Sequence, residues 1–122
     1  MLLDTIFFID LEGELRAGVR GPCAAFLQAH RHETKHVSVV TMGEFAVGAS
    51  AAKTVQFFRG YQRLALGRDV AVFAGRLQSR LPFELGENDL WIAATALWHE
   101  LPLATCDRVF TRIPNLKVVR YR

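Results

Sequence analysis

The stretch Gly86-Glu87-Asn88-Asp89-Leu90-Trp91-Ile92-Ala93-Ala94-Thr95-Ala96-Leu97 places two carboxylates and an amide at the start of an apolar, alanine-rich helix. Packing alone does not require so much acid at one end of a helix. Three further acidic residues, Asp4, Glu44 and Asp107, directly or shortly follow apolar, strand-like runs. We therefore predict that these three residues and Asp89 meet in space and bind a divalent metal ion.

The rest of the chain alternates short apolar runs with segments of helical spacing. The predicted strands are residues 1–3, 36–40, 64–66, 101–105 and 116–119, the last at an edge of the sheet. The predicted helices begin after Asp4 and also cover about residues 24–32, 41–49, 51–64, 69–80 and 86–97. This alternation implies a mainly parallel sheet with helices on both faces. We predict a single α/β domain over residues 1–122, built as a three-layer α/β/α sandwich.

Each acidic residue also has a purely structural interpretation. Asp4 and Asp107 are suited to cap helices, and Thr41-Met42-Gly43-Glu44 matches a capping box with Thr41 as N-cap. Asp89 would suit the helix dipole from the first turn. A parallel sheet, however, collects its strand ends at one edge, where ligands bind. Four carboxylates crowded there would raise one another's pKa unless a cation were present, and Mg²⁺ or Mn²⁺ prefers oxygen ligands of this kind.

The composition indicates a globular chain with an anionic partner. The 122 residues carry a formal net charge of +3, and twelve of the fifteen basic residues are arginine, which suits bidentate phosphate contacts. The charge favours nucleic acid as a partner, although an ordinary solvated surface explains it equally well. No apolar run approaches the roughly 20 residues that span a bilayer. With no basic leader and no CxxC motif, we expect a cytoplasmic protein that does not contact membranes.

Four blocks of the sequence, in order along the chain, resemble a single protein family. They are Leu2-Leu3-Asp4-Thr5, then Ser38-Val39-Val40-Thr41-Met42-Gly43-Glu44, then Asn88 to Leu97, and finally Leu103-Ala104-Thr105-Cys106-Asp107 followed by Phe110 and Ile113-Pro114-Asn115-Leu116. Together they resemble the PIN-domain ribonucleases, specifically the VapC-type toxins of bacterial toxin–antitoxin pairs. The third block is the most specific, and the resemblance runs from end to end of the chain.

The resemblance implies endonucleolytic cleavage of RNA that depends on Mg²⁺ or Mn²⁺. The implied catalytic acids are Asp4, Glu44, Asp89 and Asp107. Among these, Asp4, Asp89 and Asp107 are the implied metal ligands, while Glu44 would position water or the ion. Thr5, Asn88 and Thr105 are the implied supporting residues. The resemblance also implies an antitoxin protein as partner and a homodimer.

One residue departs from the family pattern, and two other functions compete with the nuclease. Ile6 stands where the family usually places a small polar residue after Asp-Thr, which favours a catalytically silent PIN-like module that binds RNA or protein. The four acids oppose that alternative. A phospho-receiver domain would carry paired acids after its first strand and a lysine after a late strand. Here Asp4 is followed by Thr5, and Lys117 lies inside the last predicted strand, so this alternative fits poorly.

Overall fold

The computed structural model describes residues 1–122 as alternating strands and helices. In chain order the elements are β1 (Leu2–Leu3), α1 (Thr5–Ala17), α2 (Pro22–Ala29), β2 (His36–Ser38), α3 (Val39–Ala46), α4 (Ala51–Phe57), β3 (Gln62–Leu64), α5 (Arg68–Arg80), α6 (Glu87–Trp98), β4 (Leu103–Ala104), the 3-10 helix η1 (Arg108–Arg112) and β5 (Val118–Val119). The strands form one sheet in the order β3-β2-β1-β4-β5, and all neighbouring pairs are parallel. The predicted parallel α/β architecture is confirmed, with β5 at an edge.

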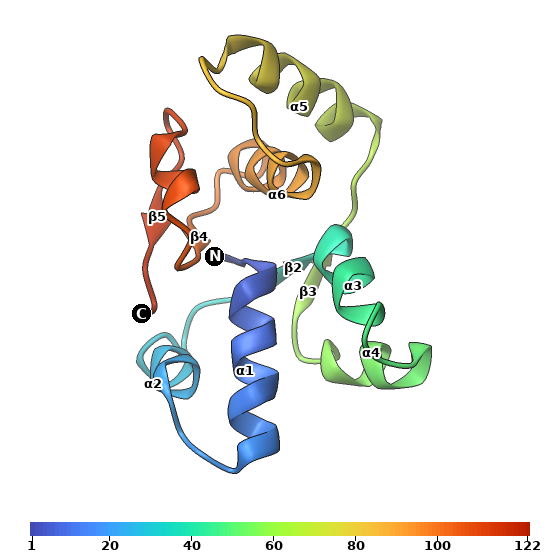
Figure 1. Cartoon of the computed structure of the whole chain (residues 1–122), viewed down its shortest axis with the longest axis vertical. Helices are drawn as coiled ribbons and strands as arrows, with labels where there is room; N and C mark the ends of the chain where they lie inside the picture. The colour runs from blue at the N-terminus through green and yellow to red at the C-terminus, as the bar shows by residue number, and fades with distance from the viewer.

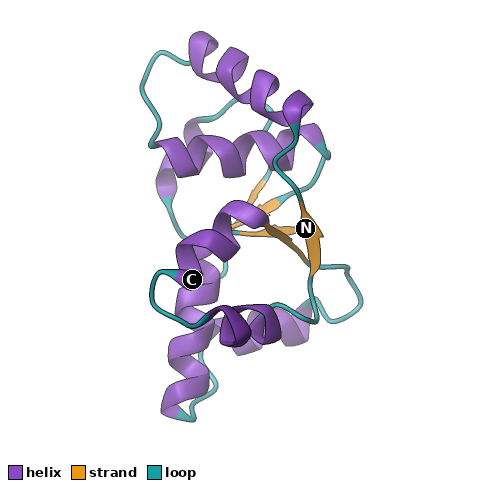
Figure 2. Ribbon diagram, turned by 90° about the vertical axis from the view of Figure 1, so that its right-hand side faces the viewer, coloured by secondary structure: helices purple, strands orange, loops and turns teal.

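Helices cover both faces of this sheet. Helices α5 and α6 lie on one side of it, and α1, α2 and α4 lie on the other (Figure 1, Figure 2). Successive residues of a strand point to opposite faces, so Leu2 joins the apolar cluster under α6 while Leu3 joins the cluster that contains Phe7 and Phe8. Two separate cores result, one in each outer layer. No helix combines the length and apolar composition needed to cross a membrane.

Helix α1 starts directly at the end of the central strand β1. Asp4 is its N-cap, with its side chain accepting a hydrogen bond from the Thr5 N–H, and this fixes where the helix begins. Phe7 and Phe8 are fully buried against the sheet. Gly18 ends the helix in the left-handed region at a φ of 69°, a conformation that glycine adopts without steric penalty. Asp4 is thereby placed at the carboxyl end of the central strand of the sheet.

The helix predicted over residues 51–64 is wrong in its second half. Helix α4 ends at Phe57, and β3 follows, beginning two residues before the strand predicted at 64–66. The apolar residues that suggested one continuous helix do not share a buried face, because Phe58 is 2% exposed and Val55 is 59% exposed. Strand β3 is a polar strand at the edge of the sheet. Its backbone pairing with β2, and not its side-chain pattern, determines its conformation.

The predicted boundary between the second strand and its helix is also wrong. The strand predicted over residues 36–40 ends at Ser38, whose hydroxyl caps α3 by accepting from the backbone N–H two residues later, at 3.1 Å. Thr41 is therefore inside α3, and the capping box with Glu44 does not form. The Thr41 side chain is fully buried and contacts Thr5 at 2.8 Å. A tertiary hydrogen bond has replaced the local one that the sequence pattern indicated.

Helix α2 occupies Pro22–Ala29, earlier than the predicted residues 24–32. Proline fits the first helical turn because its missing N–H needs no partner there. The carboxylate of Glu14, in the last turn of α1, caps the start of α2. Its donors are the N–H groups of Gly21, Cys23 and Ala24, at 2.8, 2.8 and 3.1 Å.

Candidate active site

The candidate site lies where the three central strands end. Asp4 directly follows β1, and its N–H donates to the carbonyl of Ala104, the last residue of β4, at 3.0 Å. Thr105 directly follows β4, and its N–H donates to Val119 in β5 at 3.1 Å. Helix α3, which carries Glu44, begins directly after β2. The parallel topology therefore delivers these side chains to one edge of the sheet.

Both carboxylate oxygens of Asp4 are held by hydrogen bonds. Oδ1 accepts from the Thr5 N–H at 2.8 Å, and Oδ2 accepts from the Thr105 hydroxyl at 2.7 Å. The residue is only 4% exposed. Burial raises the pKa of Asp4 to about 6, the two hydrogen bonds oppose that rise, and the charges of Asp89 and Asp107 add to it. Asp4 is thus a rigidly held carboxylate in a negatively charged environment.

Thr105 connects Asp4 to Asp107. Its hydroxyl donates to Asp4 and accepts from the Asp107 N–H at 3.0 Å. Thr105 itself is fully buried. The side chain of Asp107 is exposed and caps η1 by accepting from the Val109 N–H at 3.0 Å. Asp107 therefore performs the capping role that its sequence suggested, and it also lies close enough for its charge to act on Asp4.

Glu44 and Asp89 reach the same region from two helices that pack together, α3 and α6. The Glu44 carboxylate accepts a hydrogen bond from the Thr5 hydroxyl at 2.7 Å through Oε1. Asp89 is half-buried in the first turn of α6. Burial raises the pKa of Asp89, and the charges of Asp107 and Glu44 raise it further. Asn88 is exposed in the same turn, and its side chain makes no hydrogen bond to any of the acids.

Asp89 and Asp107 thus lie close enough for their charges to act on Asp4, and Asp107 and Glu44 act in the same way on Asp89. No three His, Cys, Asp or Glu side chains converge closely enough to hold an ion directly. Charge interactions extend well beyond the coordination distance of about 2.0–2.1 Å that Mg²⁺ requires, so the acids can affect one another's pKa without forming a metal site. The donor chemistry, carboxylate oxygens that repel one another, fits a hard divalent cation.

Ile6 does not leave Asp4 unsupported. Both oxygens of Asp4 already accept hydrogen bonds, one from Thr5 and one from Thr105. The Ile6 side chain is half-buried and packs against the aromatic core on the α1 side of the sheet. A polar side chain at this position is therefore not needed to orient the first aspartate in this protein.

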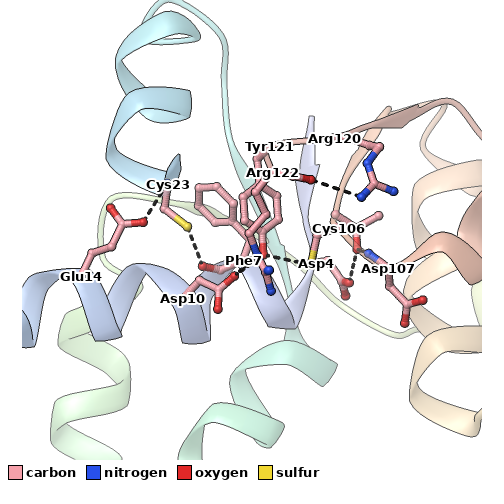
Figure 3. Close-up of polar contacts among 11 residues, drawn as sticks. Asp4, Phe7, Asp10, Glu14, Cys23, Cys106, Asp107, Arg120, Tyr121 and Arg122 are labelled. Carbon is pink, nitrogen blue, oxygen red and sulfur yellow. Dashed lines mark hydrogen bonds and ion pairs between the residues drawn. The ribbon is translucent and has the colours of Figure 1, made fainter. Parts of the chain in front are cut away.

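The sequence analysis missed a polar cluster beside the Asp107 loop. The Tyr121 hydroxyl donates to Asp10 Oδ2 at 2.7 Å and lies 3.5 Å from the sulfur of Cys106, the residue between Thr105 and Asp107 (Figure 3). Arg122 Nε also donates to Asp10, at 2.9 Å. Nothing in the local sequence indicates these contacts, because Asp10 and Tyr121 are 111 residues apart. The cluster ties the last residues of the chain to α1.

The sequence matches a known protein family and two curated relatives. Residues 1–116 match the PIN domain family. Ribonuclease VapC4 of Mycobacterium tuberculosis is 30% identical over 96 residues, which cover 68% of this chain and 74% of that protein. Ribonuclease VapC5 of the same organism is 37% identical over 91 residues, 62% of this chain and 66% of the relative.

The fold is shared with solved structures as well. A toxin–antitoxin complex from Klebsiella pneumoniae contains a chain that superposes with a TM-score of 0.75 and 28% identity. The alignment covers 99% of this chain and 97% of that one. The chain described here therefore belongs to the PIN domain family, and within that family it is similar to the VapC ribonucleases.

Proposed function

We propose that this protein is a metal-dependent endoribonuclease that acts as the toxin of a toxin–antitoxin pair. The observation that carries the proposal is the state of Asp4, which is buried, held by two hydrogen bonds and surrounded by the charges of Asp89 and Asp107. A fold does not gain stability from such an arrangement, and unfavourable clusters of this kind are typical of functional sites. The two ribonucleases among its relatives support the choice of chemistry.

Asp4, Asp89 and Asp107 would hold Mg²⁺ or Mn²⁺. The ion, when bound, lowers the pKa of a coordinated water and stabilises the charge of a phosphoryl transition state. Asp4 contributes the fixed position, because hydrogen bonds from Thr5 and Thr105 hold its carboxylate. Asp107 is exposed and Asp89 is half-buried. Their carboxylates would turn toward the ion and supply further oxygen ligands.

Glu44 has a different role from the three aspartates. Its Oε1 is occupied by the Thr5 hydroxyl, so Oε2 can accept a hydrogen bond from a water molecule in the pocket. A carboxylate in that position can orient the attacking water and accept its proton. Asn88 would act only at the rim, since it is exposed and hydrogen-bonds to none of the acids.

The substrate would be RNA, bound partly through arginine. Arg108 directly follows Asp107, and Arg112 lies one turn further along η1, where its guanidinium sits 3.9 Å from the centre of the Phe83 ring. Both residues are exposed, and guanidinium groups close in sequence to Asp107 can contact the phosphates that flank a scissile bond. We also place the protein in the cytoplasm and expect it to form a homodimer, which size-exclusion chromatography would test.

An apolar groove beside the site suits the antitoxin. It has a volume of about 910 Å³, lies between α1 and the α3–α4 region, and reaches Glu44. Ile9, Leu15 and Val47 line it and are 51%, 64% and 90% exposed. Exposed apolar side chains in a continuous groove are typical of protein interfaces. Leu15→Asp should weaken capture of the co-expressed antitoxin at least tenfold, and unchanged capture would move the interface elsewhere.

The decisive test compares wild type with Asp89→Asn, which removes one charge with little change in shape. We expect calorimetry to show Mn²⁺ binding by the wild type that weakens at least tenfold in the variant, and a screen of tRNA, rRNA and mRNA to show cleavage only by the wild type. Equal, negligible Mn²⁺ binding by both proteins would contradict the proposal. A silent PIN-like binding module would then be the better description.

A further inference from the structure

A chain of hydroxyl groups leads from the protein interior to Glu44. The Thr41 hydroxyl oxygen lies 2.8 Å from that of Thr5, and the Thr5 hydroxyl donates to Glu44 Oε1 at 2.7 Å. The Thr5 hydroxyl carries a single proton. Because the carboxylate oxygen can only accept, that proton points to Glu44, and Thr41 is the donor in the contact with Thr5.

The surroundings leave Thr41 few other partners. Its side chain is fully buried in α3, and Thr5 is 8% exposed at the start of α1. No side chain other than Thr5 hydrogen-bonds to the Thr41 hydroxyl. Thr41 and Glu44 are three residues apart on one helix and therefore share a face. Both side chains therefore face Thr5, the first residue of α1.

We propose that Thr41 is a positioning residue for Glu44. By donating to Thr5, Thr41 prevents the Thr5 hydroxyl from turning away, and the Thr5 proton then holds Glu44 Oε1 in the pocket. The consequence for catalysis rests on the proposed nuclease function. The placement of Glu44 does not, because it is a property of the folded protein alone.

Burial makes this series of hydrogen bonds sensitive to the loss of one hydroxyl group. Hydrogen bonds in series polarise one another, and a buried hydroxyl that loses its partner becomes unfavourable. Thr41→Val has nearly the same shape but no donor, so it frees the Thr5 hydroxyl to rotate. Thr41→Ser keeps the donor and removes only a methyl group. The pair of variants separates hydrogen bonding from packing.

The first experiment measures RNA cleavage at saturating Mg²⁺. We expect Thr41→Val to lower kcat about three- to tenfold with KM within twofold, and Thr41→Ser to retain at least half of the wild-type kcat. Thr54→Val is the matched control, because Thr54 is also buried and its hydroxyl donates only to the carbonyl of Ser50, the N-cap of α4. In a Glu44→Ala background, Thr41→Val should change kcat less than twofold. The same loss in both backgrounds would mean that Thr41 does not act through Glu44, and an unchanged kcat in the wild-type background would overturn the proposal.

A second experiment does not depend on activity. Crystal structures of the metal-free proteins should show Glu44 Oε1 within hydrogen-bond distance of the Thr5 hydroxyl in wild type and Thr41→Ser. In Thr41→Val we expect the Glu44 carboxylate to leave that position. An unmoved carboxylate would refute the positioning role. A wild type that fails to cleave RNA would instead refute the nuclease, and the crystal structures would still decide the role of Thr41.

Discussion

Two carboxylates at the two ends of α1 have opposite properties. Asp4 caps the start of the helix and accepts hydrogen bonds from Thr5 and Thr105, yet its pKa is raised to about 6 by burial and by nearby acids. Glu14, in the last turn, also experiences burial that raises its pKa. Three backbone N–H groups at the start of α2 outweigh that effect, so the pKa of Glu14 is lowered.

The difference lies in the neighbours of each carboxylate. The carboxylate of Glu14 lies at the start of α2, where unpaired N–H groups attract negative charge. Asp4 lies among other acids, where each added charge repels it. Glu14 as a carboxylate therefore stabilises the fold, whereas ionised Asp4 destabilises it. A residue retained at such an energetic disadvantage points to function.

The largest expected effect comes from neutralising Asp4. Asp4→Asn removes the carboxylate that we propose as the fixed metal ligand, so we expect RNA cleavage to fall at least about 100-fold and Mn²⁺ affinity to fall in parallel. The shape of the side chain is preserved, and the Thr5 N–H keeps an acceptor. Cleavage assays and calorimetry on both proteins measure the loss. Near-normal cleavage by the variant would place the chemistry at other residues.

The same substitution should stabilise the metal-free protein at neutral pH. A folded pKa of about 6 against an ordinary 3.8 means that the folded state holds its proton more tightly. Asp4 therefore contributes a stability that is fully present below about pH 4 and is lost as the pH rises through about 6. The loss in the free energy of unfolding is at most about 3 kcal/mol. Urea unfolding in EDTA should show this decline between pH 4 and 7 in wild type and a smaller one in Asp4→Asn. Parallel pH profiles would contradict the comparison.

Glu14 should respond in the opposite direction. We expect Glu14→Gln to lower the free energy of unfolding by about 1–2 kcal/mol at pH 7, because charge-assisted bonds to the N–H groups of α2 are weakened. Because the pKa of Glu14 is lowered in the folded state, the extra stability of the wild type is present at neutral pH. This stability is lost as the pH falls through the folded pKa of Glu14. RNA cleavage should stay within twofold. A large loss of cleavage with unchanged stability would assign Glu14 to the active site.

Gly21→Ala should give the smallest effect. It tests the contact between the Glu14 carboxylate and the start of α2 from the α2 side. A Cβ at this position would lie 2.8 Å from Cδ and Oε2 of Glu14, so the carboxylate must move. We expect a loss of about 0.5–1 kcal/mol in wild type. In a Glu14→Ala background the close contact is gone, and the reduced entropy of the unfolded chain should make the same change stabilising. Destabilisation of equal size in both backgrounds would show that the clash with Glu14 is not its cause.

The sequence indicated the positions of the acids better than the contacts that hold them. Asp4 and Asp107 follow apolar runs, and parallel topology brings the ends of such runs to one edge. Their roles in metal binding and catalysis remain predictions. The structure adds Thr105 as the hydroxyl that joins them, in a place consistent with the supporting role predicted for it.

Thr41 shows why other contacts were not predictable. Its spacing from Glu44 satisfies the rule for a local cap, but the chain enters α3 three residues earlier, at Ser38. Its actual partner, Thr5, is 36 residues away. Local rules also failed at β3, where pairing with β2 determines the conformation of a polar segment. In each case a long-range interaction outcompeted the local preference.

The hydrogen bond between Thr105 and Asp4 spans 101 residues of sequence. Strand β1 pairs with β4, and Asp4 and Thr105 directly follow these two strands. During synthesis on the ribosome, a growing chain that has not yet released Thr105 contains Asp4, Glu44 and Asp89 but not the hydroxyl that holds Oδ2 of Asp4. The complete set of hydrogen bonds around Asp4 can therefore form only after Thr105 has left the ribosome.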